Sequence, residues 1–197
     1  MRAERVCGSL LLAAVFALGG CDRSEPAAAP FNNVDLTGAK YAKDFRLTDH
    51  AGVVRTLADF KGKVTVIFFG FTHCPDACPT TMGELAEVRK RLGTDAGRLQ
   101  VLFVTLDPER DTAEALSKYV PAFDPSFLGL YGTPEQTAEV AREFKVFYQK
   151  VPGQTPLSYS LDHSAGSYVF DKEGRIRLLI RPNQPIEAVL ADLRRLI

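Results

Sequence analysis

The chain has 197 residues, which is enough for one globular domain with flanking segments but not for two full domains. Hydrophobic residues make up 46% and charged residues 24%, a composition that excludes an intrinsically disordered chain. Lys plus Arg and Asp plus Glu both total 24, whereas a nucleic-acid-binding domain usually carries a basic excess. We therefore expect no nucleic-acid partner.

The N-terminal segment has the pattern of an export signal. Arg2 and Arg5 precede an apolar run from Val6 to Leu18, and two glycines follow it. This run is shorter than the ~20 apolar residues that a helix needs to cross a bilayer. Residues 1–20 are therefore predicted to be a cleaved signal peptide, with an uncleaved membrane anchor as the alternative.

Cys21 follows this run directly. The sequence Leu18-Gly19-Gly20-Cys21 resembles the bacterial lipoprotein signal, in which the cysteine becomes the lipidated first residue of the mature protein. Asp22 resembles the signal that keeps some bacterial lipoproteins in the inner membrane. We therefore expect an inner-membrane lipoprotein that faces the periplasm and contacts the membrane through the lipid on Cys21. Residues 21–39, rich in Ala and Pro, are predicted to be the tether.

Residues 40–197 are predicted to form the folded domain. Alternating apolar residues and β-branched runs predict the strands, and caps followed by apolar residues at helical spacing predict the helices. In chain order, the expected elements are a hairpin at 45–48 and 53–57, a strand at 64–69, a helix from Pro79 to residue 92, a strand at 99–106, a helix at 112–120 preceded by a cap at Asp111, a strand at 127–130, a helix at 134–144, a hairpin at 167–171 and 175–181, and a final helix from Pro185.

This order indicates an α/β protein with a central sheet flanked by helices. A cysteine pair at the strand-to-helix junction after the first buried strand is the thioredoxin-like arrangement. The N-terminal β-hairpin at 45–57 is an addition to it.

Cys74 and Cys78 are the cysteines expected to remain in the exported domain, because Cys7 leaves with the signal and Cys21 takes the lipid. In an oxidising compartment such a pair forms a disulfide by default. The pair closes only a very short loop, so a redox or metal role is favoured over a structural disulfide or an inert pair. The following helix N-terminus is expected to lower the pKa of these thiols toward thiolate.

A copper site would need a further ligand beside the two thiolates, and the chain has three histidines. The ring of His73 is expected to point away from the sulfurs. His50 is expected to be solvated in a turn. His163 lies in a polar stretch before a strand, where loops can fold over a site, although position alone favours a solvated side chain.

Three motifs resemble the Sco/SenC family, whose members are copper chaperones for cytochrome c oxidase assembly. They are Gly70-Phe71-Thr72-His73-Cys74-Pro75-Asp76-Ala77-Cys78-Pro79, Asp107-Pro108-Glu109-Arg110-Asp111-Thr112 and Leu161-Asp162-His163-Ser164-Ala165. The resemblance covers the chain from about residue 40 to its end. It implies that Cys74, Cys78 and His163 are copper ligands, with Asp107 and Asp162 in a supporting role. One departure is the lipoprotein-type Cys21, because many family members have an uncleaved helical anchor.

The chemistry of these residues agrees with the resemblance. Two thiolates and an imidazole suit Cu(I) and can also hold Cu(II), and three ligands leave one side of the metal open for transfer. A structural zinc site needs four protein ligands, and no fourth Cys or His is placed to supply one. Met82 falls at helical spacing with Leu85 and is assigned to the core.

The leading hypothesis is a metallochaperone, expected to be a monomer, that delivers copper. The recipient is an oxidase copper-site subunit or another copper chaperone, and the thiols can also pass electrons. The alternative is an enzyme, a thiol-disulfide reductase that keeps a partner's metal-binding cysteines reduced. That reductase needs Cys74 and Cys78 but not His163. A peroxide-reducing enzyme of this fold is disfavoured, because Asp76 puts an acidic group beside the thiols.

Overall fold

The computed structural model of the chain describes residues 30–154 and 158–197. The predicted signal peptide at 1–20, the predicted lipidation residue Cys21 and the rest of the predicted tether up to residue 29 lie outside the described residues. The folded unit begins at Phe31.

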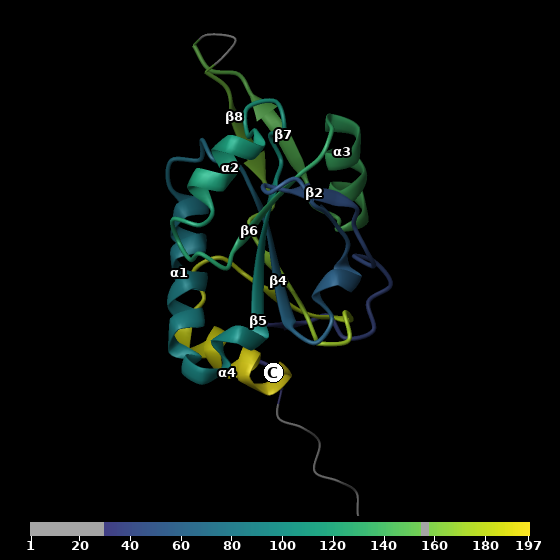
Figure 1. Ribbon diagram of the computed structural model, residues 1–197, viewed down its shortest axis with the longest axis vertical. Helices are drawn as coiled ribbons and strands as arrows, with labels where there is room; N and C mark the ends of the chain where they lie inside the picture. Colours follow the sequence, from purple (N-terminus) through teal and green to yellow (C-terminus); the bar gives the residue numbers. More distant parts are fainter. Residues whose placement is uncertain (1–29, 155–157) are drawn as a thin grey trace, which may run out of the picture. The chain divides into compact units, whose positions relative to one another are not determined.

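A mixed sheet of eight strands forms the centre of the described part of the chain (Figure 1). Its strands are β1 (Val34–Asp35), β2 (Leu47–Asp49), β3 (Val54–Arg55), β4 (Val64–Gly70), β5 (Leu99–Thr105), β6 (Leu128–Tyr131), β9 (Ser167–Phe170) and β10 (Ile176–Ile180). The spatial order is β1-β10-β9-β4-β5-β6-β2-β3. The strands β4, β5 and β6 run parallel, and the other neighbouring pairs are antiparallel.

Helices cover this sheet. They are α1 (Ala77–Arg91), α2 (Ala113–Tyr119), α3 (Pro134–Glu143) and α4 (Ile186–Leu196), with 3-10 turns η1 (Leu57–Phe60) and η2 (Gly93–Arg98). In Figure 1, α1 and α2 lie on one side of β4 and β5, and α3 lies on the other. Among the described helices, none has both the length and the apolar character required to cross a membrane.

The core lies around β4 and β5, which are buried along their whole length, as their largely apolar sequences predict. Phe68, Phe69 and Phe103 are among the largest fully buried side chains. Burial of each such ring contributes about 1.5–3 kcal/mol. The packing therefore fixes the carboxyl ends of these two strands, where α/β proteins commonly place their sites.

Strands β7 (Tyr148–Val151) and β8 (Ser160–His163) form a separate antiparallel hairpin. It projects beyond the end of the main sheet, at the top of Figure 1. An isolated two-stranded hairpin is only marginally stable in water, so this one depends on contacts with the rest of the protein. The sequence analysis missed it and treated residues 161–166 as a polar stretch before a strand, because the hairpin offers few apolar residues.

The start of the folded unit also differs from the predicted boundary at residue 40. Strand β1 pairs with β10. The fully buried carboxylate of Asp192 in α4 accepts hydrogen bonds from Asn32 and Asn33 at 2.8–3.0 Å. Residues 31–39 therefore belong to the folded unit and not to a tether. A two-residue strand is too short to be recognised from its pattern.

The predicted N-terminal hairpin is present, because β2 pairs with β3. Its second strand is shorter than the predicted 53–57. The chain turns into η1 at Leu57, where a capping box between Thr56 and Asp59 starts the 3-10 turn.

Candidate metal centre

The three sequence-predicted ligands come from two segments at one end of the sheet. Cys74 lies in the loop between β4 and α1, and Cys78 lies in the first turn of α1. His163 is the last residue of β8. The loop with Cys74 continues directly from β4, whereas His163 belongs to the separate hairpin.

Cys78 lies close to both other predicted ligands. Its Sγ lies 3.7 Å from Nε2 of His163. Its backbone N–H donates a hydrogen bond of 3.4 Å to Sγ of Cys74. Both thiols are free. Within residues 30–154 and 158–197, no three His, Cys, Asp or Glu side chains are gathered tightly enough to hold a metal ion. Binding a metal would therefore require these side chains to adjust.

The tautomer of His163 follows from its neighbours. Nδ1 lies 2.9 Å from the carbonyl oxygen of Ser164, and a carbonyl oxygen can only accept, so Nδ1 carries the proton. In the neutral ring, Nε2 then presents its lone pair to the Cys78 thiol. Phe68 and Phe71 pack edge-on against the ring, with centroids 6.3 and 6.0 Å away. A histidine held this way is oriented as metal-ligating histidines are.

Cys78 is fully buried, although it lies at the strand-to-helix junction. The reason is that α1 begins at Ala77 and not at Pro79, so Cys78 is already inside the first turn and faces the core. Gly70 makes room for it, since a Cβ on Gly70 would lie 2.9 Å from Cys78 Sγ.

Burial raises the pKa of the Cys78 thiol. A hydrogen bond from the Phe71 backbone acts in the opposite direction, and the neighbouring Cys74 and Asp111 add to the rise. The predicted lowering by the helix N-terminus is therefore wrong for Cys78, because desolvation outweighs the helix dipole. Without a metal, Cys78 is a thiol and not a thiolate.

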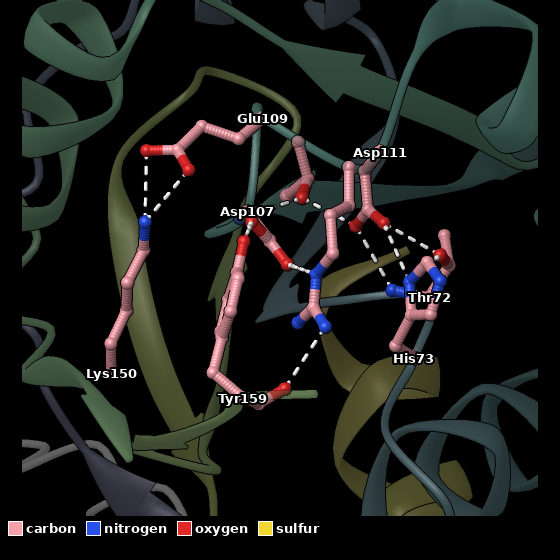
Figure 2. Close-up of polar contacts among 9 residues, drawn as sticks. Thr72, His73, Asp107, Glu109, Asp111, Lys150 and Tyr159 are labelled. Atoms are coloured by element: carbon pink, nitrogen blue, oxygen red, sulfur yellow. Dashed lines mark hydrogen bonds and ion pairs between the residues drawn. The ribbon is translucent and has the colours of Figure 1, made fainter. Parts of the chain in front are cut away.

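Asp111 fixes the loop that carries Cys74 (Figure 2). Its buried carboxylate accepts hydrogen bonds from the backbone N–H of Thr72 at 2.9 Å and from the Thr72 hydroxyl at 2.5 Å. The Thr105 hydroxyl at the end of β5 donates a third, at 2.6 Å. The loop is thereby held against β5.

This role of Asp111 corrects the sequence analysis, which placed it as the cap of the following helix. Thr112 caps α2 instead, and its side chain accepts a hydrogen bond from Ala115 N at 3.2 Å. Tertiary partners in the β4–α1 loop use the carboxylate, so it does not serve the local cap.

Asp107 organises a second cluster, on the hairpin side (Figure 2). Its carboxylate accepts hydrogen bonds from Arg110 Nε at 2.5 Å and from the Tyr159 hydroxyl at 2.7 Å. Arg110 Nη1 also donates to the Tyr159 carbonyl at 2.9 Å, and the guanidinium lies 3.7 Å from the centre of the Tyr159 ring. At the edge of the cluster, Lys150 donates to the Glu109 carboxylate at 2.8 and 2.9 Å.

Sequence reasoning missed Arg110, Tyr159 and Lys150. Arg110 lies inside the quoted central motif, which was the available signal. Nothing in the sequence alone marks the partnership of Tyr159 and Lys150, because they meet Asp107 and Glu109 only through the fold. Asp162, which was given a supporting role, has an exposed side chain.

The other histidines and Met82 are accounted for. His73 lies beside the buried carboxylate of Asp111, with Nδ1 3.6 Å from Oδ1 (Figure 2). His50 is half-buried and not solvated as predicted, because its Nδ1 accepts a hydrogen bond from Gly129 N at 3.0 Å. Met82 is fully buried, which confirms its assignment to the core.

Comparison with known proteins places these features in a family. The family model described as SCO1/SenC matches residues 34–197. The human mitochondrial protein SCO2 homolog is 37% identical over 154 residues, which cover 77% of this chain and 58% of that protein. An SCO2-like protein of Rickettsia conorii is 38% identical over 144 residues, or 73% of this chain and 70% of that protein. The chain spans 50–60% of the length of the mammalian relatives it matches.

Solved structures show the same fold. Bradyrhizobium japonicum ScoI with copper bound has a TM-score of 0.72 and 40% identity, covering 78% of this chain and 98% of that chain. Apo Sco1 from Thermus thermophilus has a TM-score of 0.77 and 43% identity, covering 87% and 100%. Yeast Sco1 with copper bound has a TM-score of 0.70 and 30% identity, covering 84% and 88%. These similarities confirm the predicted thioredoxin-like α/β fold.

Proposed function

The chain belongs to the SCO1/SenC family, and from this premise we propose that it carries copper as cargo for the assembly of a cytochrome oxidase copper centre. Cys74, Cys78 and His163 are the proposed ligands. The recipient would be an oxidase copper-site subunit or another copper chaperone, and the carrier would act as a monomer.

The observation that carries this proposal is the geometry at Cys78. The deprotonated Nε2 of His163 faces Cys78 Sγ at 3.7 Å, while Ser164 holds the proton on Nδ1. Cys74 lies within hydrogen-bonding distance of the Cys78 backbone. Two soft sulfurs and an imidazole suit Cu(I) and can hold Cu(II). Relatives with 40% and 30% identity have been solved with copper bound, which supports the same cargo here.

Copper binding would also change the protonation state of Cys78. A metal ion stabilises the thiolate, so binding releases the proton that burial keeps on Cys78 in the free protein. Copper affinity should therefore rise with pH. The half-buried Cys74 is the more accessible of the two sulfurs and would be the first to meet an incoming metal.

The placement of the site supports delivery by a tethered protein. The chain enters the folded unit beside α4, where Asn32 and Asn33 bind Asp192. The hairpin that carries His163 lies at the opposite end of the long axis (Figure 1). With the proposed lipid on Cys21 in the inner membrane, the folded unit with its metal centre would lie in the periplasm.

The test is copper binding by the reduced protein from residue 22 onward, so that Cys21 contributes no thiol. We expect one tightly held copper in the wild type and much weaker binding in His163→Ala when a chelator competes. His73→Ala is the matched control, since His73 is also beside the site but is not a proposed ligand. A wild type that holds no copper would reject the proposed function, and a loss confined to His73→Ala would reject the ligand set.

A second function is favoured by the asymmetry of the thiols. Cys74 is half-buried and Cys78 fully buried, which is suited to a thiol-disulfide reductase. The Cys74 sulfur would attack a partner's disulfide. Cys78 would then attack the mixed disulfide, releasing the partner's dithiol and leaving a Cys74–Cys78 disulfide. Disulfide reduction that survives in His163→Ala, in a protein that holds no copper, would favour this function.

A further inference from the structure

The hairpin β7–β8 carries His163 but belongs to no larger sheet. Both of its strands are tied to one short loop, residues 107–110, directly after β5. Tyr159, the residue before β8, binds Asp107 and Arg110. Lys150 in β7 binds Glu109. This loop therefore holds the hairpin beside the end of β5 (Figure 2).

The contacts differ in strength. The side chains of Asp107 and Arg110 are only 1% and 18% exposed, so their ion pair is little screened by solvent. Tyr159 adds a hydroxyl bond to Asp107 and a ring 3.7 Å from the Arg110 guanidinium. By contrast, Lys150 and Glu109 are 51% and 56% exposed, and such exposed pairs contribute little to stability. The group Asp107–Arg110–Tyr159 is named here the hairpin clamp.

The same loop also holds the thiol side of the centre. The Thr105 hydroxyl accepts a hydrogen bond from Asp107 N at 2.9 Å and donates one to Asp111 at 2.6 Å. Asp111 in turn binds Thr72 in the cysteine loop. The segment from 105 to 111 thus connects the two halves of the site by an unbroken series of hydrogen bonds.

We propose that Arg110 and Tyr159 are positioning residues for the metal centre: with Asp107, they hold the β7–β8 hairpin so that His163 Nε2 faces the Cys78 sulfur. Neither residue touches the proposed ligands. Tyr159 precedes His163 by four positions along an extended strand, or about 13 Å. A small rotation of the hairpin at the clamp therefore becomes a larger displacement of the imidazole. This inference rests on the proposed copper site.

The experiment compares Tyr159→Phe and Arg110→Gln with the wild type. Tyr159→Phe removes one hydroxyl and keeps the ring beside Arg110. Arg55→Gln is the matched control, because Arg55 makes the same kind of pair with a buried aspartate, Asp49, at 2.8 Å in the β2–β3 hairpin. Each protein is measured for copper affinity against a chelator, for its Cu(II) electron paramagnetic resonance spectrum, and for hydrogen exchange of the hairpin amides without metal.

We expect the two clamp variants to lose about 10–100-fold in copper affinity, as residues that orient a metal ligand typically do. Their Cu(II) spectra should change and their β7–β8 amides should exchange faster. Arg55→Gln should bind copper as the wild type does and leave exchange in β7–β8 unchanged. If Arg110→Gln fails to fold, Tyr159→Phe still decides the question.

Two outcomes would overturn the inference, and they are distinct from a failure of the proposed function. Faster hairpin exchange with wild-type copper affinity and spectrum would make the clamp a purely structural contact. Unchanged exchange in both variants would mean that the clamp does not hold the hairpin at all, whether or not the wild type binds copper. Absence of copper binding in the wild type rejects the carrier function, and the exchange data then judge the clamp alone.

Discussion

The two sides of the candidate metal centre are held in different ways. The thiol side, residues 70–78, is continuous with β4, and Cys78 and its neighbour Asp111 are fully buried. The histidine side, β7–β8 with Tyr159, is a separate two-stranded sheet, and Phe147 beside it is 58% exposed. The sulfurs are therefore positioned by the main sheet and α1, whereas the imidazole is carried by a hairpin outside that sheet.

This difference suits the proposed carrier, which would both hold and release a metal. Regions with few buried contacts open at a lower free-energy cost than the core does. We therefore expect the hairpin to move when copper is bound or transferred, while the cysteine loop stays in place. Variants that act on one side only test this difference between the thiol side and the histidine side.

Asp111→Ala should have the largest effect. It removes a buried acceptor of three hydrogen bonds and leaves Thr72 and Thr105 with unsatisfied polar groups. Each such group costs about 1–3 kcal/mol, so the free energy of unfolding should fall by about 3 kcal/mol or more. Urea denaturation measures this. Asp162→Ala, at an exposed carboxylate on the histidine side, should stay within about 0.5 kcal/mol of the wild type.

Gly70→Ala should have the next largest effect. The added Cβ would lie 2.9 Å from Cys78 Sγ and 3.0 Å from both Phe68 and Phe103. Overpacking of this kind costs about 1–3 kcal/mol, and the displaced Cys78 should weaken copper binding.

Gly83→Ala in α1 is the matched control for that variant. Nothing lies within 4 Å of a Cβ at this position. Alanine in a helix interior should stabilise the protein by about 0.5–1 kcal/mol. Equal unfolding midpoints for the two variants in thermal denaturation would show that the thiol side is less tightly packed than described.

The same contrast explains what the sequence could predict. The strands β4 and β5 were predicted because burial on both faces leaves a largely apolar run in the sequence. Helix α3 was predicted from a local cap followed by Pro at the first helical position, and the structure shows this cap at Thr133 and Pro134. The hairpin β7–β8 was missed, because it offers few apolar residues and its polar partners Asp107 and Arg110 lie far from it in sequence.

The candidate site was predictable to a similar degree. Its three ligands were selected by resemblance, and the structure brings His163 to Cys78. The burial of Cys78 was not predictable, because it depends on the start of α1 and on the space beside Gly70. Asp111 was misassigned because an Asp three residues before a Glu fits a helix cap, and only the fold reveals its other partners.

The histidine side should also respond to alkaline pH. Burial raises the pKa of Tyr159 to about 12, and the hydrogen bond to Asp107 adds to the rise. The unfolded chain, with an ordinary tyrosine pKa of about 10, therefore releases this proton first. The stability that the Tyr159 hydroxyl contributes is therefore fully present below about pH 10 and is lost as the pH rises toward 12. Asp107, Glu109, Arg110 and Lys150 are the charged groups that face this phenol.

Hydrogen exchange of the β7–β8 amides against pH, corrected for the intrinsic rate, measures this effect. Tyr159→Phe should abolish the alkaline opening of the hairpin. Tyr168→Phe is the control, since burial also raises the pKa of Tyr168 to about 12, but its hydroxyl binds the Phe144 carbonyl in the core. Alkaline opening of the hairpin that persists in Tyr159→Phe and disappears in Tyr168→Phe would place the responsible group in the core.

Lys150→Ala should have the smallest effect. It tests the difference between the outer ion pair and the buried clamp on the histidine side. Lys150 contacts both Glu109 and the Tyr159 ring, at 2.8 Å and 4.7 Å, yet it is half-exposed. Solvent and salt screen such a pair, so unfolding free energy should change by less than about 1 kcal/mol and copper affinity by less than about 5-fold. Urea denaturation and copper binding against a chelator, each at low and high salt, measure these two changes. The opposite outcome is a loss of copper affinity in Lys150→Ala as large as that in Tyr159→Phe, together with an equal loss in the wild type at high salt. That outcome would show that the outer ion pair positions the histidine and that the buried clamp does not.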